Sequence, residues 1–210
     1  SDLAYARILE TLFERKLPAG AFVSQNELVE LLGIPVAPLR DALRVLETEG
    51  ILTIHPRSGI QFVKPGLELT RSTYQFRTIL ERAAVVVYAE TADDAELAEI
   101  ERRHRAATAA IEADGLTDAM KEELDALEGV LHGAIIASLN NPLIETSYKR
   151  MHTYLRLVRL DRKLTVPLAQ RSLREHMEII LACQARDPEK AAAALVAHFT
   201  AALQRHMGMF

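Results

Sequence analysis

The chain has 210 residues, of which 49% are hydrophobic and 26% are charged, and this composition excludes an intrinsically disordered protein. A formal net charge of −4 provides no general positive field, so any contact with nucleic acid must come from a local group of basic side chains. The apolar runs are too short to span a bilayer and no signal peptide is apparent, so we expect a cytoplasmic protein. Cys183 is the single cysteine, which excludes an intrachain disulfide.

The first third of the chain begins with two predicted helices. An apolar stripe predicts a helix over residues 3–16, and proline and glycine within residues 17–20 end it. Ser24 and Glu27 have the spacing of a capping box, which predicts that a second helix begins at residue 25. Gly33 is expected to end that helix in a left-handed conformation.

A third helix follows after only a few residues. Pro38 suits its first turn, Gly50 ends it, and its buried stripe is formed by Leu39, Ala42, Leu43 and Leu46. Arg40 and Arg44 fall on the opposite face, one turn apart. Two short helices joined by a tight turn, with polar side chains facing outward from the second, are typical of a helix-turn-helix.

Residues 51–54 and 60–63 are predicted to form the two strands of a hairpin, with Arg57 at its tip. A hairpin in this place is a wing that can reach the minor groove. The helix-turn-helix is also a common packing unit, and its arginines are open to interpretation as solvated surface charges. The basic hairpin that follows it favours DNA binding.

Residues 32–52 (LGIPVAPLRDALRVLETEGIL), together with the wing segment 56–59, resemble the GntR family of bacterial regulators. The resemblance implies a winged helix-turn-helix with DNA contacts from Arg40, Arg44, Arg57 and Gly59. The family's usual serine-arginine-threonine turn is replaced by residues 35–37 (PVA), which removes one arginine that often touches DNA. We therefore expect an altered operator preference or affinity.

Beyond Pro65-Gly66 the pattern is helical almost throughout, so we predict one domain over residues 1–65 and a second over residues 66–210. Caps, prolines and glycines divide the second domain into six predicted helices, at residues 71–90, 93–112, 118–139, 142–162, 166–186 and 188–207. The expected fold class is mainly α: a winged helix-turn-helix followed by an antiparallel helical bundle.

Three histidines of the second domain, His132, His176 and His198, lie in apolar stretches of three different predicted helices. Glu128 precedes His132 by four residues and therefore shares its helix face. Such a set would bind a divalent metal if the helices brought it together, but the spacing alone favours isolated core or surface histidines. The remaining histidines of this domain, at positions 104, 152 and 206, are interpreted as surface residues.

The order of Glu128, His132, the Asn141-Pro142 pair and the two later histidines resembles the FCD effector domain of the FadR branch of GntR regulators. The resemblance implies that Glu128, His132, His176 and His198 hold a divalent ion. Zinc is the first choice, with nickel or manganese as alternatives. Glutamate replaces the usual aspartate, which bears on metal geometry and preference.

Arg77 matches the family's arginine-x-x-leucine-glutamate segment, which ends here at Glu81. Its planar guanidinium is suited to a carboxylate effector, although an i, i+4 pair with Glu81 is an equal alternative. The leading hypothesis is a homodimeric repressor that binds a palindromic operator under the control of metal and a small organic acid. The alternatives are a metal-dependent hydrolase and a sensor that has lost DNA binding.

Overall fold

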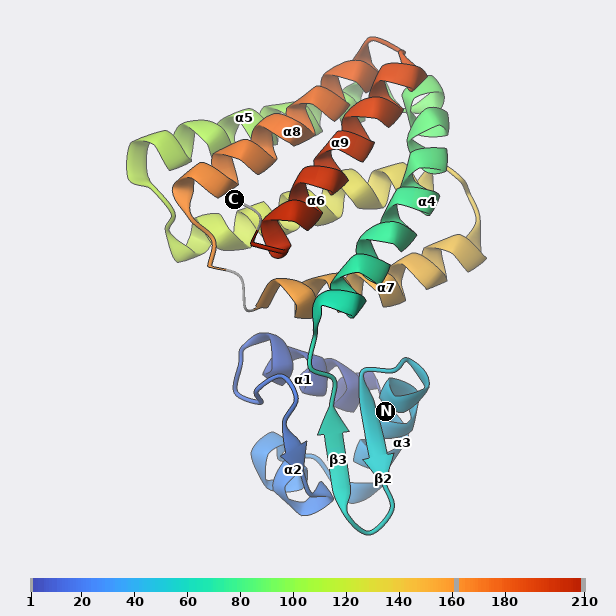
Figure 1. Cartoon of the computed structure of the whole chain (residues 1–210), viewed down its shortest axis with the longest axis vertical. Coiled ribbons are helices and arrows are strands. Elements are labelled where there is room, and N and C mark those ends of the chain that lie inside the picture. Colours follow the sequence, from blue (N-terminus) through green and yellow to red (C-terminus); the bar gives the residue numbers. More distant parts are fainter. Residues whose placement is uncertain (1, 161–162, 209–210) are drawn as a thin grey trace. The chain divides into compact units, whose positions relative to one another are not determined.

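The computed structural model describes residues 2–160 and 163–208, and it is mainly α-helical with one small sheet (Figure 1). The predicted fold class is confirmed. Contacts within the chain define two compact units. The first contains the chain up to Thr70 together with the part of the seventh helix from Arg150 onward, and the second contains Arg71–Lys149 and the chain from Lys163 onward. The domain boundary expected after Pro65 stays a prediction.

The first unit has the order of elements of a winged helix-turn-helix. Its elements are α1 (Asp2–Phe13), β1 (Phe22–Val23), α2 (Gln25–Leu32), α3 (Val36–Thr48), β2 (Leu52–His55) and β3 (Gly59–Phe62). The sheet is antiparallel in the order β1-β3-β2, and Gln61 of β3 lies opposite Phe22 of β1 and Thr53 of β2. The sequence analysis missed β1, because two residues are too short to show an alternating pattern.

The start and end of α2 agree with the capping signals in the sequence. The Ser24 side chain accepts a hydrogen bond from the Glu27 backbone N–H, and the Glu27 carboxylate accepts one from the Ser24 backbone N–H. Gly33 closes the helix in the left-handed region, at φ 63°. These local bonds satisfy amides that the helix itself leaves unpaired, so the adjoining turn to α3 begins at a defined residue.

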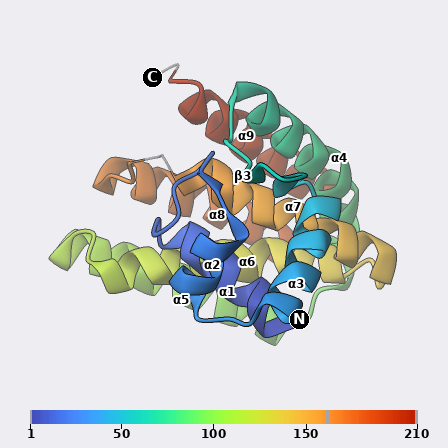
Figure 2. The same ribbon diagram turned by 90° about the horizontal axis from the view of Figure 1, so that it is seen from below.

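The apolar stripe predicted for α3 is buried. It forms one core with apolar side chains from α1, α2 and the sheet, including Ile8, Leu12, Leu28, Leu39, Ala42, Leu43, Leu46 and Phe62. Figure 2 shows α1, α2 and α3 from below. Because this stripe is used for packing, the opposite face of α3 is left to solvent.

The six expected helices follow β3, with ends that differ from the predicted ones by up to four residues, and most of their length belongs to the second unit. They are α4 (Leu67–Thr91), α5 (Asp94–Asp114), α6 (Asp118–Ala137), α7 (Pro142–Leu160), α8 (Val166–Gln184) and α9 (Pro188–His206). The predicted end of the fourth of these helices at Arg162 lies outside the described residues. Within this unit α8 packs against α5 and α9, and α5 also packs against α6. Among the described helices, none combines the length and apolarity needed to cross a membrane.

Candidate metal centre and DNA-binding surface

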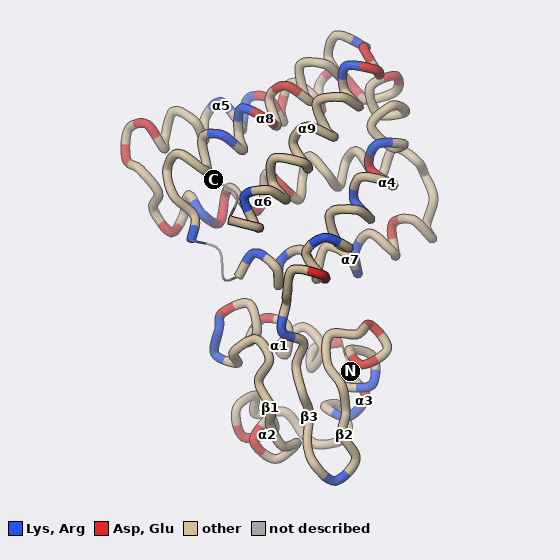
Figure 3. Tube along the Cα trace, in the orientation of Figure 1, with Lys and Arg blue, Asp and Glu red and all other residues tan. Residues whose placement is uncertain are grey.

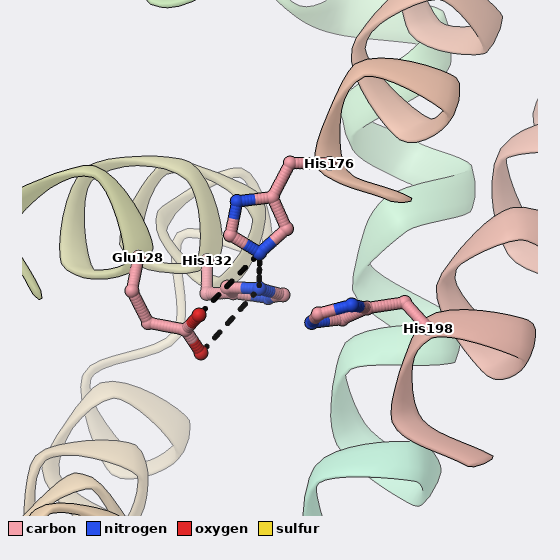
Figure 4. A group of neighbouring side chains, drawn as sticks. All are labelled: Glu128, His132, His176 and His198. Atoms are coloured by element: carbon pink, nitrogen blue, oxygen red, sulfur yellow. Dashed lines mark hydrogen bonds and ion pairs between the residues drawn. The ribbon is translucent and has the colours of Figure 1, made fainter. Parts of the chain in front are cut away.

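Three helices of the second unit bring one carboxylate and three imidazoles together. Glu128 and His132 come from α6, His176 from α8 and His198 from α9. All four are buried, and one potential ligand atom from each lies within 4.8 Å of the others. Figure 4 shows their side chains turned toward a common point. The structure therefore brings together residues that the sequence could only place on three separate helices.

The individual separations are those of neighbouring ligands. His132 Nε2 lies 3.4 Å from His176 Nε2, and His176 Nε2 lies 3.4 Å from Glu128 Oε2. Glu128 Oε1 lies 3.6 Å from His132 Nε2. Ligand atoms about 2.0–2.1 Å from a tetrahedral zinc ion lie about 3.3–3.4 Å from one another, so the separations among Glu128, His132 and His176 suit a metal of that size. The potential ligand atom of His198 lies within 4.8 Å of those three.

The other ring nitrogen of each imidazole is bonded outside the cluster. His132 Nδ1 lies 2.5 Å from Glu81 Oε2, and His198 Nδ1 lies 2.7 Å from Glu175 Oε2. Because a carboxylate can only accept, each Nδ1 carries the proton and each Nε2 offers a lone pair to the cluster. Burial lowers the pKa of His132 and His198, which favours the neutral imidazoles that bind metals.

His176 is held differently, by a fourth histidine. Its Nδ1 lies 3.2 Å from His104 Nε2, and His104 Nδ1 lies 2.7 Å from the Ile100 carbonyl oxygen. His104 is fully buried on α5, so its interpretation as a surface residue is wrong. Burial first, and then the neighbouring His176, lowers the pKa of His104 to about 4. His104 comes four residues after Ile100 and belongs to the buried stripe of α5. This helical periodicity is the sequence signal that could have predicted its burial.

Of the other two histidines interpreted as surface residues, neither is fully exposed. His152 and His206 are both half-buried. The His206 ring bonds the carbonyl oxygen of Ala202 in the preceding turn of α9.

Arg77 is fully buried on α4 and links two carboxylates of the site. Its Nε donates to Glu81 at 2.7 Å and its Nη1 donates to Glu128 at 2.8 Å. Burial opposes its charge, but the two carboxylates outweigh this and raise the pKa of Arg77. The Arg77–Glu81 pair, which the sequence analysis gave as an alternative, is thus present in the structure. The sequence analysis did not predict the second pair, between Arg77 and Glu128. Its Nη2 is buried and has no hydrogen-bond partner among the described residues.

Glu175 of α8 supports the cluster from the other side. It accepts two hydrogen bonds from Arg205, at 2.6 and 2.8 Å, in addition to the one from His198. Burial alone would raise the pKa of Glu175, but Arg205 and His198 outweigh that effect and lower it to about 2. The sequence analysis assigned no role to Glu175, because its neighbour Arg205 is thirty residues away in the chain.

The predicted DNA contacts lie on the surface of the first unit. Arg40 and Arg44 are exposed on α3, and Arg57 is exposed in the turn between β2 and β3. Figure 3 shows basic positions in blue on α3 and in that turn. The Nε of Arg40 donates to the side chain of Gln25 at 2.9 Å, so α2 orients this arginine. Gln25 had no assigned role in the sequence analysis.

Gly59 is required by the packing of the wing. A Cβ at this position would lie 2.8 Å from the Phe22 ring and 2.9 Å from the Val23 carbonyl oxygen, and its φ is +148°. Both contacts are to β1, so glycine permits the close approach of β3 to that strand. A direct role of Gly59 in DNA contact stays a prediction.

Comparison with known proteins agrees with this division. Residues 1–62 match the family described as bacterial regulatory proteins, gntR family, and residues 72–201 match the FCD domain. The chain therefore belongs to the GntR-family transcriptional regulators that carry an FCD domain. These families and the relatives below are regulators and not enzymes, so the hydrolase alternative is set aside.

Relatives span most of the chain. It is 24% identical to the HTH-type transcriptional regulator YdhC of Bacillus subtilis (strain 168), over 93% of this chain and 85% of that protein. The fold resembles E. coli McbR/YncC, with a TM-score of 0.76 at 19% identity over 99% and 96% of the two chains. It also resembles the Zn²⁺-bound FCD domain of TM0439, with a TM-score of 0.54 at 24% identity over 68% and 94%.

The bonds of Glu175 predict a specific pH dependence of stability. The pKa of Glu175 is about 2 in the folded chain and ordinarily 4.5, so its contribution is fully present above about pH 5 and is lost as the pH falls toward 2. Glu175→Gln should cost on the order of 3 kcal/mol of unfolding free energy near neutral pH, at about 1.4 kcal/mol per pKa unit. The difference from the parent should shrink in acid.

Urea unfolding of chelator-treated protein at several pH values between about 7 and 3 measures this difference. Glu178→Gln, at an exposed position of the same helix, is the control and should track the parent throughout. Parallel curves for Glu175→Gln and the parent would contradict the assignment.

Proposed function

We propose that this regulator is a homodimeric repressor of the FadR branch, which binds a palindromic operator and responds to a small organic acid at a metal site in its FCD domain. The observation that carries the proposal is the buried cluster of Glu128, His132, His176 and His198. Two-fold symmetry of the protein would match two operator half-sites, which is the usual geometry for helix-turn-helix proteins.

The chemistry of the cluster fits a divalent ion. With protons on Nδ1, the Nε2 atoms of His132 and His176 present lone pairs to each other at 3.4 Å, an arrangement that a shared cation stabilises. The Nε2 of His198 is buried without a hydrogen-bond partner among the described residues. Metal-binding histidines characteristically donate their second nitrogen to a carboxylate or another fixed acceptor, as they do here.

Zinc is the preferred ion, because imidazole nitrogens and a carboxylate oxygen are among the ligands that it takes. The Zn²⁺-bound structure of a related FCD domain supports this choice. Nickel and manganese remain alternatives, since imidazole also suits nickel and carboxylate also suits manganese. Glu128 replaces the usual aspartate, and its longer side chain reaches Arg77 while remaining beside His132 and His176.

The charges around the site favour an anionic effector. Three carboxylates, from Glu81, Glu128 and Glu175, face two guanidinium groups, from Arg77 and Arg205, which leaves one net negative charge. A divalent ion would change this to one net positive charge, and a single carboxylate would then neutralise the buried site. The unpaired Nη2 of Arg77 is the donor that we assign to that carboxylate.

DNA binding is assigned to the exposed arginines. Arg40 or Arg44 replaced by alanine should weaken operator binding by about 1–3 kcal/mol, or roughly 5- to 150-fold, because a base or phosphate contact is lost. The measurement is a fluorescence-anisotropy titration of an operator duplex selected from random DNA by the parent protein.

Arg102→Ala removes an exposed arginine from α5 in the second unit and serves as the matched control for net charge. It should bind DNA as the parent does. If the Arg40 and Arg44 variants also bind like the parent, α3 does not read DNA. If the parent selects no duplex, the chain is a sensor that has lost DNA binding, as residues 35–37 would allow.

Metal binding is tested at His198. His198→Ala should lose most of its bound metal, because the variant retains only three of the four ligands. Elemental analysis of the purified protein, before and after reconstitution with zinc, measures the metal content. His55→Ala, which removes a histidine from β2, should keep the parent's content. A parent without stoichiometric divalent ion after reconstitution would contradict the proposed centre.

Coupling between effector and operator must be reciprocal. If a small acid changes operator affinity through the metal, operator DNA must change the affinity for that acid by the same factor, which is typically about 5- to 150-fold. Titration of acetate, lactate and succinate into zinc-loaded protein, with and without the selected duplex, measures both factors.

Glu128→Ala should weaken the binding of the acid and reduce this response while retaining DNA binding in the absence of acid. If it instead lowers the melting temperature and DNA affinity together, the metal holds the bundle together and does not act as a sensor. An equal affinity for the acid with and without DNA would rule out the coupling.

A further inference from the structure

We propose that His104 is a positioning residue that sets the ring orientation and tautomer of His176, so that His176 Nε2 faces the metal. This inference rests on the proposed metal centre. It concerns a residue outside the four-ligand cluster, on a helix that contributes none of the ligands. His104 comes from α5, whereas the ligands come from α6, α8 and α9.

The bonding of His104 determines where the protons lie. Its Nδ1 lies 2.7 Å from the Ile100 carbonyl oxygen, which can only accept, so Nδ1 carries a proton. His104 is fully buried and is bonded to a carbonyl and an imidazole, so the neutral ring is favoured and Nε2 offers a lone pair. His176 Nδ1 lies 3.2 Å from His104 Nε2, so it must donate its own proton to that lone pair. His176 Nε2 then carries no proton, and it lies on the side of Glu128 and His132.

The same chain of bonds also holds the His176 ring in place. The rings of His104 and His176 meet edge to face, with centroids 5.3 Å apart and an interplanar angle of 67°. The α5 helix packs against α8, so His104 reaches His176 from a helix already fixed by packing. One backbone-anchored imidazole, that of His104, therefore takes the place of the carboxylate that holds each of the other histidine ligands.

The outer partner of a histidine ligand affects the basicity of that ligand, and an imidazole acts differently from a carboxylate in this role. Glu81 and Glu175 are anions that increase the basicity of His132 and His198, whereas His104 is a neutral acceptor and increases that of His176 less. A third anion would also add a buried negative charge. His104 thus orients His176 without adding charge to a centre that already contains three carboxylates.

Two substitutions separate orientation from packing. His104→Phe keeps the ring volume but removes the acceptor, whereas His104→Gln places an amide oxygen near the position of Nε2 and can still accept from His176. Loss of an outer bond of this kind typically weakens metal affinity about 10- to 100-fold. We therefore expect that weakening for His104→Phe and an affinity within a few-fold of the parent for His104→Gln.

Zinc affinity is measured by competition with a chelating dye. Imidazole ¹⁵N chemical shifts of His176 in chelator-treated protein report its tautomer, which packing alone would leave unchanged. His206→Phe is the control, because the His206 ring makes the same bond to the carbonyl oxygen four residues earlier on its own helix, at 2.8 Å. It should bind zinc like the parent.

The outcomes distinguish this inference from the function on which it rests. Weaker zinc binding by His104→Phe, rescue by His104→Gln and a changed His176 tautomer in the phenylalanine variant alone would support it. Parent-like zinc affinity and an unchanged tautomer in His104→Phe would overturn it and leave the metal centre standing. If that variant does not fold, failure of His104→Gln to retain the parent's affinity and tautomer overturns it. A parent that binds no zinc would overturn the metal centre itself.

Discussion

The buried guanidinium of Arg77 is the constraint on which the centre of the second unit depends. It lies between Glu81 and Glu128, at 2.7 and 2.8 Å, and all three side chains are almost fully removed from solvent. Carboxylates in such surroundings are costly unless a cation compensates them. Arg77 therefore allows one carboxylate to orient His132 and another to stand among the imidazoles. The Phe199 ring, 4.4 Å from the guanidinium carbon, covers it with an aromatic face.

Around this ion pair the site is built in two layers. The inner layer consists of the four side chains whose ligand atoms converge, and the outer layer consists of Glu81, His104 and Glu175, one for each imidazole. Such outer bonds determine which nitrogen is protonated, and thus which nitrogen is available to a metal. Each outer residue comes from a different helix, so the arrangement of α4, α5 and α8 is part of the site's chemistry.

The first unit differs from the second because its candidate functional side chains are exposed and not buried. Many of its apolar side chains pack into one core, and the arginines to which we assign DNA contact lie on the surface. Glu47 illustrates the link between the two, because its carboxylate on α3 accepts a hydrogen bond from the Ile54 backbone N–H at 2.7 Å. This bond ties the wing to the helix that carries Arg40 and Arg44. The bond therefore fixes the wing relative to α3, and Arg40 and Arg44 lie on the exposed face of that helix.

Features set by neighbouring residues could be predicted from the sequence. The capping box at Ser24, the left-handed Gly33, the buried stripe of α3 and the six helices of the second unit all rest on local propensity and periodicity. The four candidate metal ligands came from a family resemblance, since spacing alone favoured isolated histidines. Tertiary structure decided that convergence, the burial of His104 and the pairing of Arg77 with Glu128. Contacts between residues 51 or 72 positions apart depend on how helices pack, and a helical period specifies only which face of a helix is buried and not which partner it meets.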